Sequence, residues 1–320
     1  MHKAIVVPQA GGPEILRMED VELPLPAAGQ ILVKVGAAGV NFIDTYKRSG
    51  VYPVSYPFIP GTEAAGTVVS AGLESGFREG DRVATAEGGG TYSEYTLMDA
   101  GAALPVPAGI TDETAAALML QGMTAHYLCN STFPVQEGQT ALVHAGAGGV
   151  GLLLIQLLKA KGAAVITTVS TEDKEVLARG AGADHVLRYE GFTGQVRGLT
   201  GGTGVDVVFD GVGRATFDGS LASLRTRGMM VLFGGASGQV PPFDIQRLNS
   251  SGSLFLTRPT LAHYLLSPEE RQWRARELFD AVLAGTLDVR IGQTYPLAEA
   301  ARAHADLEGR KTTGKVLLLP

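Results

Sequence analysis

The chain has 320 residues, of which 45% are hydrophobic and 18% charged, so it can bury a substantial core and is long enough for two domains. Its 26 basic and 32 acidic residues give a net charge of -6, without any run of lysines or arginines, which makes nucleic acid an unlikely partner class. The single cysteine, Cys129, excludes an internal disulfide framework and any metal site built from several thiolates. We therefore expect a reducing, cytoplasmic setting, and no membrane association, because no apolar run approaches the roughly 18 residues that cross a bilayer.

The first 110 residues are predicted to be rich in β-strands. Short apolar runs at 4–7, 31–35 and 66–69 are separated by glycine and proline. Thr111 then has the features of a helix N-cap, and the good helix formers of 115–120 follow it. The character of the sequence changes at this point.

Residues from about 138 to 257 are predicted to form a parallel sheet, because strand and helix patterns alternate along them. The expected elements are 140–144, 149–161, 164–169, 173–179, 185–187, 205–210, 215–224 and 228–234. A helical stretch at 268–284 and a final strand at 315–319 follow. This tail has too few strands to form a domain of its own, so we expect it to return to the first domain.

A glycine motif follows the first strand of the alternating region. Gly146, Gly148 and Gly151 fit the spacing G-x-G-x-x-G, between the strand pattern of 140–144 and the helix pattern of 149–161. In this context the first glycine allows a tight turn, the second lets a pyrophosphate approach the backbone, and the third permits close packing of helix on strand. The helix N-terminus then favours the phosphate charge, so the motif predicts a dinucleotide site.

The end of the next strand indicates which dinucleotide is bound. NAD sites usually carry an acidic residue there, whereas this strand ends in Ser170-Thr171, and Lys174 lies one turn into the next helix. A small hydroxyl leaves room for a 2′-phosphate and the lysine supplies positive charge, which favours NADPH. Glu172 and Asp173 suit the first turn of a helix better than ribose binding.

Three further strand ends are expected to complete the cofactor crevice. They are Asp210-Gly211-Val212-Gly213, Phe233-Gly234-Gly235-Ala236-Ser237 and Tyr189. Ligands of open α/β sheets bind at the carboxyl ends of the strands, and glycine there lets a ligand lie against the backbone.

Several dispersed motifs resemble a known family over nearly the whole chain. They are Gly11-Gly12-Pro13-Glu14, Asn41-Phe42-Ile43-Asp44-Thr45-Tyr46, Gly61-Thr62-Glu63-Ala64-Ala65-Gly66, Gly80-Asp81-Arg82-Val83, the glycine motif with His144-Ala145 before it, and Thr257-Arg258-Pro259. Together they resemble the zinc-free quinone oxidoreductase branch of the medium-chain dehydrogenase/reductases, which includes zeta-crystallin. The resemblance implies an α/β protein with a GroES-like, β-rich catalytic domain at 1–122 and 258–320 and a Rossmann domain at 123–257. It also implies NADPH in the cleft between the domains and a homodimer.

The resemblance also bears on zinc. Zinc-dependent relatives carry a cysteine near the position of Asn41 and a His-Glu pair where this chain has Thr62-Glu63. Both the cysteine and the histidine are absent here, so we expect no catalytic metal and a structural role for Glu63. Gln121 stands where close relatives often have lysine, which leaves a charge-based role at that position open.

By resemblance, four side chains line the nicotinamide end as candidate catalytic residues: Asn41, Asp44, Tyr46 and Tyr52. Asn41 is expected to hydrogen-bond the cofactor or a substrate oxygen, and Arg48 is expected on the same loop as Tyr52. Lys315 is expected to reach the adenosine phosphate or the pyrophosphate. The expected cofactor-binding residues are Asn41, Thr124, Gly146, Ala147, Gly148, Gly149, Val150, Gly151, Ser170, Lys174, Tyr189, Val212, Phe233, Gly234, Ser237, Phe255, Leu256, Thr257 and Lys315. His144 and His126 are expected to serve packing.

The function that follows is hydride delivery from NADPH to a quinone without a metal. The cofactor carries the difficult chemistry, and the protein holds donor and acceptor together and stabilises the developing negative charge. An enone, 2-alkenal or 2-haloacrylate reductase on the same fold stays open, as does the identity of the proton donor, which is Tyr46, Tyr52 or solvent. A non-enzymatic role, as a crystallin-like NADPH-binding protein or an RNA-binding protein, is the alternative of another class.

Overall fold

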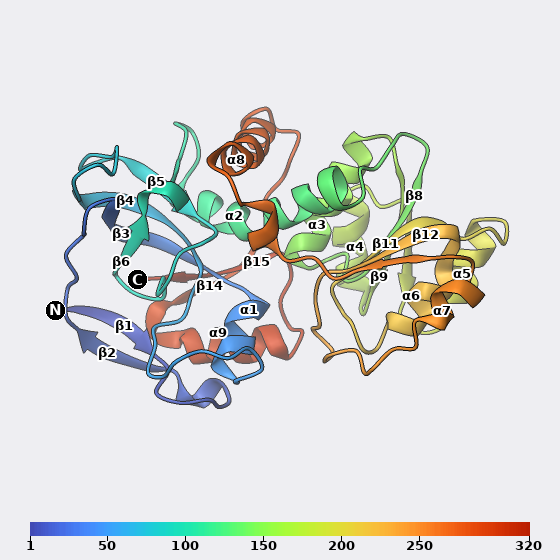
Figure 1. Ribbon diagram of the computed structural model, residues 1–320, viewed down its shortest axis with the longest axis horizontal. Helices are drawn as coiled ribbons and strands as arrows, with labels where there is room; N and C mark the ends of the chain where they lie inside the picture. Colours follow the sequence, from blue (N-terminus) through green and yellow to red (C-terminus); the bar gives the residue numbers. More distant parts are fainter. The chain divides into compact units, whose positions relative to one another are not determined.

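The computed structural model describes all residues from Met1 to Pro320, and these form two compact units (Figure 1). Unit 1 contains Met1–Met123 and Leu265–Pro320, and unit 2 contains Thr124–Tyr264. Both chain ends therefore belong to unit 1, as expected for a tail that returns to the first domain.

Unit 1 is built on a seven-stranded sheet. Six of its strands have the order β14-β15-β3-β4-β5-β7, and β6 pairs with β3. The bounds are β3 Gln30–Val40, β4 Glu63–Ala71, β5 Arg82–Thr85, β6 Tyr95–Asp99, β7 Leu104–Pro105, β14 Ile291–Pro296 and β15 Lys315–Leu319, with a separate hairpin of β1 His2–Val6 and β2 Arg17–Val21. The final strand β15 lies between β14 and β3, which confirms that the tail completes this sheet.

The core of unit 1 follows from the alternation of side chains along β3. Ile31, Val33 and Val35 point to one face, because successive residues of a strand alternate between faces, and all three are buried. Helix α9 (Ala300–Glu308) covers this core with Ala303 and Leu307. The other helices of unit 1 are α1 Phe42–Arg48 and α8 Pro268–Leu283, and α2 Asp112–Tyr127 begins in this unit.

Unit 2 is a six-stranded sheet whose strands are all parallel, in the order β10-β9-β8-β11-β12-β13. The bounds are β8 Thr140–Val143, β9 Ala164–Val169, β10 His185–Arg188, β11 Val205–Asp210, β12 Leu224–Leu232 and β13 Phe255–Thr257. Its helices are α3 Gly149–Ala160, α4 Glu172–Gly180, α5 Phe192–Leu199, α6 Phe217–Ser223 and α7 Gln246–Ser250. Figure 1 shows α3 and α4 on one face and α5 and α6 on the other, the doubly wound arrangement that the alternating pattern predicted.

The second boundary between the units differs from the expected one. It lies after Tyr264 instead of after residue 257, so β13 and the short turn Leu261–Tyr264 belong to unit 2. The ring of Tyr264 stacks on that of Tyr127, with centroids 4.3 Å apart and an interplanar angle of 9°. This aromatic contact holds the turn to unit 2, and the sequence pattern gave no sign of it.

Candidate active site

The predicted glycine motif lies at the carboxyl end of β8 and at the start of α3. Gly148 is the N-cap residue of α3, and no side chain caps the helix there. The backbone N–H of Gly146 donates to Thr168 O at 3.0 Å, which ties the loop to β9. A helix N-terminus without a side-chain cap presents its N–H groups and dipole to an anion.

The three template glycines are required for different reasons. A Cβ on Gly146 would lie 2.1 Å from Thr167 Oγ1, and one on Gly151 would lie 2.3 Å from Ala145 O, so the fold itself forbids a side chain at both. A Cβ on Gly148 would meet only Ala145 O, at 3.2 Å. Even at Gly148 a Cβ would make a tight contact, and without one the backbone stays accessible where the motif places a pyrophosphate, so the cradle fits a dinucleotide.

The end of β9 carries the residues expected to select NADPH. Ser170 is exposed directly after the strand. Thr171 is the N-cap of α4 and accepts a hydrogen bond from the backbone N–H of Lys174, at 3.3 Å. Glu172 and Asp173 lie in the first turn of α4, as expected, so they suit the helix dipole.

Asp210, at the carboxyl end of β11, organises the next loop. Its buried carboxylate accepts hydrogen bonds from the backbone N–H groups of Val212 and Gly213, at 2.8 and 2.9 Å. It also accepts from the hydroxyls of Thr216 and Ser220, at 2.7 and 2.8 Å. The loop that follows β11 therefore has a fixed backbone beside the glycine motif.

His144 joins this network from the end of β8. Its Nε2 lies 2.9 Å from Ser220 Oγ and its Nδ1 2.8 Å from Thr168 Oγ1. Burial lowers the pKa of His144, although the nearby Asp210 acts in the opposite direction. A buried, neutral ring with two hydroxyl partners agrees with the packing role expected from the sequence.

The remaining predicted cofactor residues of unit 2 are spread over several strand ends. Tyr189, directly after β10, stacks on His144 with centroids 6.2 Å apart. Ser237 donates to Val212 O at 2.8 Å and accepts from Ala215 N at 2.9 Å, so it connects the loops that follow β11 and β12. The ring of Phe233 packs against Gly211, where a Cβ would lie 2.9 Å from it.

The other predicted cofactor residues of unit 2 lie on strand β13 and at Thr124, outside the loops described above. β13 is the edge strand beside β12, and its Phe255 is 56% exposed, while Leu256 and Thr257 are half-buried. Thr124, the first residue of unit 2, is 8% exposed.

In unit 1, sheet register brings three predicted residues together. Val40 pairs with Val316 and Gly39 with Glu63, so the side chains of Asn41, Glu63 and Lys315 meet at the end of β3. The Lys315 ammonium forms an ion pair with Glu63 and donates to Asn41 Oδ1 at 2.8 Å. Glu63 also accepts from the backbone N–H of Leu120 at 2.6 Å.

This cluster shows which protein groups Asn41 and Lys315 contact. Lys315, which was expected to reach the adenosine phosphate or the pyrophosphate, is 1% exposed and paired with Glu63. Burial lowers its pKa, and the adjacent Glu63 carboxylate opposes that shift. The Asn41 amide donates to Glu63 Oε2 at 2.8 Å and accepts from Lys315 and Gln121, which engages both ends of the amide within unit 1. Asn41 therefore links the start of α1 to Glu63, Lys315 and Gln121.

Gln121 takes part in the same cluster. Its Nε2 donates to Asn41 Oδ1 at 3.3 Å, whereas its buried Oε1 has no hydrogen-bond partner. The residue at this position thus acts on the Asn41 amide, and a lysine here would add a second ammonium group near Lys315.

Asp44 is an acid of the candidate site whose pKa is shifted. Its carboxylate is fully buried and accepts from the backbone N–H of Asn41 at 2.9 Å and from the Tyr92 hydroxyl at 3.1 Å. Burial raises the pKa of Asp44 to about 6, against the opposing effect of these hydrogen bonds. Such a shift at a candidate site is typical of functional carboxylates.

Tyr46 and Tyr52, two of the candidate catalytic residues, lie next to each other. Their ring centroids lie 5.4 Å apart, and the backbone N–H of Tyr52 donates to Tyr46 O at 3.0 Å. Both are half-buried, so each presents part of its ring. Arg48 was expected on the same loop but is the last residue of helix α1, is 2% exposed and pairs with Glu308, which removes it from substrate contact.

Sequence reasoning missed Tyr92 and His304 as supports of Asp44, and it placed Arg48 on a loop instead of in this cluster. Tyr92, Arg48 and His304 contact Asp44 directly or through one another, although they lie far apart along the chain. No local spacing signals such contacts. Asp210 was visible as a polar residue before a Gly-x-Gly turn, and that signal could have identified it as the organiser of the loop.

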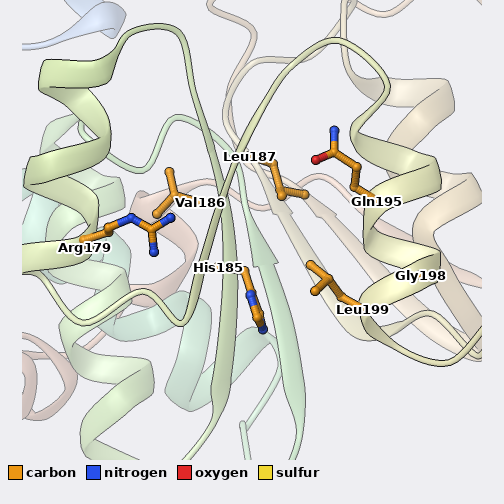
Figure 2. Close-up of a pocket in the computed structure, with 7 residues that line it drawn as sticks. All are labelled: Arg179, His185, Val186, Leu187, Gln195, Gly198 and Leu199. Carbon is orange, nitrogen blue, oxygen red and sulfur yellow. The ribbon is translucent and has the colours of Figure 1, made fainter.

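A separate pocket lies on unit 2, away from the glycine loop. It has a volume of about 350 Å³ and is lined by strand β10 and by residues of α4 and α5 (Figure 2). The lining residues are Arg179, His185, Val186, Leu187, Gln195, Gly198 and Leu199. None of them belongs to the predicted site, so we do not assign the cofactor to this pocket.

Comparison with known proteins places the chain in a family. Residues 27–108 match the alcohol dehydrogenase GroES-like domain, and residues 149–278 match the zinc-binding dehydrogenase family. A quinone oxidoreductase of Pseudomonas aeruginosa is 44% identical, with all of both chains covered. A 2-haloacrylate reductase of a Burkholderia species is 42% identical over 100% of this chain and 99% of its own.

A solved structure agrees with these relatives. The Escherichia coli quinone oxidoreductase in complex with NADPH is 42% identical, with a TM-score of 0.97, over 99% of this chain and 100% of that one. The likeness thus extends over the sequence of both units. The chain belongs to the quinone oxidoreductase branch of the medium-chain dehydrogenase/reductase superfamily.

Proposed function

We propose that this protein is an NADPH-dependent quinone reductase. The observation that carries the proposal is the glycine cradle at α3, with no side chain at Gly148 and an uncapped helix N-terminus, in a chain that matches quinone oxidoreductases over its full length. When bound, NADPH supplies the hydride for the reduction. The chain's own groups then bind, orient and protect the reactants.

The roles of these groups follow from their positions. The N–H groups at the start of α3 bind the pyrophosphate, and Ser170 with Lys174 accommodates the 2′-phosphate. Asn41, held by Glu63 and Lys315, fixes the start of α1, on which Asp44 and Tyr46 lie. The aromatic pair Tyr46–Tyr52 offers ring faces for a planar acceptor and hydroxyls for the developing negative charge.

Cofactor preference tests the role of Lys174. We expect wild-type protein to bind NADPH more tightly than NADH, because the 2′-phosphate gains a charge-assisted contact. Lys174→Ala should weaken NADPH binding roughly ten- to a hundredfold and leave NADH affinity unchanged, since removing one contact to a charged group costs about 1.5–3 kcal/mol. Fluorescence titration with both cofactors measures this, and tighter binding of NADH by the wild type would refute the assignment.

A 2-haloacrylate reductase is the second candidate, because the Burkholderia relative is nearly as similar as the quinone oxidoreductases. Comparing kcat/KM for a quinone, an enone and 2-chloroacrylate, with NADPH in each assay, separates the two. We expect the quinone to be preferred. Turnover of the chlorinated acid without turnover of the quinone would reverse the choice.

A homodimer and a cytoplasmic location complete the proposal. The exposed Phe255 on edge strand β13 supports pairing with a second copy, and sedimentation equilibrium tests it. The single, buried Cys129 suits a reducing compartment. No helix of the structure is long and apolar enough to span a membrane.

A further inference from the structure

A chain of polar side chains, buried apart from the exposed Glu308 at its start, joins helix α9 to helix α1 inside unit 1. It begins at Glu308, whose carboxylate accepts two hydrogen bonds from the Arg48 guanidinium, at 2.9 and 3.1 Å. The same guanidinium lies 3.0 Å from His304 Nδ1. His304 Nε2 is 3.1 Å from the Tyr92 hydroxyl, which in turn is 3.1 Å from Asp44 Oδ2.

From Arg48 onward, every donor in this chain points toward Asp44. A guanidinium can only donate, so His304 Nδ1 accepts and the neutral ring carries its hydrogen on Nε2. That hydrogen is donated to the Tyr92 oxygen, and the Tyr92 hydroxyl donates to Asp44. Burial, together with the Arg48 charge, lowers the pKa of His304 to about 3 and so keeps the ring neutral.

The far end of the chain is the candidate active site. Asp44 Oδ2 also accepts from the backbone N–H of Asn41, the N-cap of α1, and Tyr46 follows on the same helix. Arg48, Tyr92, His304 and Asp44 are each at most 2% exposed, so water cannot replace a missing member of the chain.

We propose that His304 is a positioning residue of this site: through Tyr92 it holds Asp44, and with it the first turn of α1, in the arrangement that the reduction requires. The proposal rests on the proposed function of the site. His304 itself touches neither cofactor nor acceptor, and it acts only through the bonds that it makes on either side.

Two substitutions break the chain with little change in volume. Tyr92→Phe removes one hydroxyl, and His304→Phe removes both bonds of the imidazole while keeping an aromatic ring beside Tyr92, in place of the present edge contact at 5.7 Å. We expect each to lower kcat for quinone reduction roughly tenfold or more, because each removes support from a buried charged group. In the double variant kcat should fall no further than in the more impaired single variant, since both substitutions interrupt the same chain of hydrogen bonds.

Tyr295→Phe is the matched control. Tyr295 is also a buried tyrosine of unit 1 whose hydroxyl donates to a carboxylate, that of Asp306, at 2.8 Å. Its removal should cost comparable stability and leave kcat unchanged. His304→Gln should restore most of the activity lost in His304→Phe, because its amide can accept from Arg48 and donate to Tyr92.

The titration of Asp44 supplies a readout that needs no cofactor. Loss of the Tyr92 donor should raise the pKa of Asp44 further, since that bond favours the carboxylate. The other charged groups that act on this region, Lys47, Lys315, Arg48 and Glu63, are present in every variant. Infrared titration of the carboxyl, assigned by its disappearance in Asp44→Asn, measures the shift.

Three results separate the possibilities. Lower kcat in Tyr92→Phe and His304→Phe, rescue by His304→Gln and a raised Asp44 titration support the positioning role. The positioning role would be overturned if both variants lost as much stability as Tyr295→Phe while kcat and the pKa of Asp44 stayed unchanged. If His304→Phe fails to fold, the same comparison is made with Tyr92→Phe alone. Absence of quinone turnover in the wild type would count against the proposed function, and the infrared titration would still test the chain.

Discussion

At the residue scale, the buried ion pair between Glu63 and Lys315 fixes the orientation of the Asn41 side chain at the end of β3. A Cβ on Gly39 would lie 2.2 Å from Glu63 Oε2 and 2.8 Å from Lys315 Cε, so the two side chains meet in the space that this glycine leaves. Both are essentially unexposed. Because Asn41 bonds to both, a change in either charge is transmitted to the start of α1.

Removing one member of this pair should be costly. Lys315→Met leaves the Glu63 carboxylate buried without its cation, and we expect a loss of about 3–5 kcal/mol in the free energy of unfolding, measured by urea denaturation. The double variant Lys315→Met with Glu63→Gln should recover a large part of that loss, since no uncompensated charge remains. A single variant as stable as the wild type would show that the pair is not buried in solution.

The pH dependence of the free energy of unfolding should show that His304 is neutral in the folded protein. Its pKa is about 3 in the folded protein and 6.5 in the unfolded chain, so its contribution is fully present above pH 6.5 and is lost as the pH falls toward 3. The full loss is about 5 kcal/mol, at about 1.4 kcal/mol per pH unit. Asp44 acts oppositely, because its pKa is raised from 3.8 to about 6, which stabilises the fold below pH 3.8 and is lost as the pH rises through 6.

Substitution of His304 isolates its contribution. His304→Gln removes the titration of the imidazole and leaves that of Asp44 in place. The free energy of unfolding should therefore fall less between pH 7.5 and pH 5 in this variant than in the wild type. Equal slopes for the two proteins would contradict the assigned neutral state of the imidazole.

At the element scale, the turn from β8 into α3 contains one glycine that the fold requires and another that the cofactor is expected to require. Gly151→Ala should destabilise unit 2, because its Cβ would lie 2.3 Å from Ala145 O. Gly148→Ala should destabilise unit 2 much less, since alanine adopts φ -78° and ψ 169° freely and its Cβ would lie 3.2 Å from Ala145 O, but it should weaken NADPH binding by tenfold or more. Thermal unfolding and cofactor titration of both variants test this, and wild-type NADPH affinity in Gly148→Ala would refute the placement of the pyrophosphate.

The sequence predicted these elements to different degrees. Unit 2 was accessible because its apolar runs and glycine turns are local signals, and strands such as β9 and β11 begin and end where expected. Helix α1 was missed, because its seven residues lie in a glycine- and proline-rich region and its N-cap, Asn41, serves side chains from other strands. The buried partners of Asp44 depend on contacts across more than two hundred residues, which no spacing encodes.

At the scale of the whole molecule, the two units divide the work. Unit 2 offers the glycine edge of a parallel sheet, and unit 1 offers an aromatic pair backed by buried charged clusters. The net charge of -6, without basic runs, agrees with a small-molecule enzyme and disfavours the RNA-binding alternative. The division also explains why the tail had to return, since Lys315 on β15 completes the cluster around Asn41.

The most direct test of the central claim is the stoichiometry of the reaction. Purified protein is mixed with NADPH and 1,4-benzoquinone without oxygen, and the loss of NADPH and the formation of hydroquinone are both quantified, with a protein-free reaction subtracted. We predict one hydroquinone for each NADPH consumed, at a rate that rises with protein concentration. NADPH consumption no faster than in the protein-free reaction would contradict the claim that this chain reduces quinones.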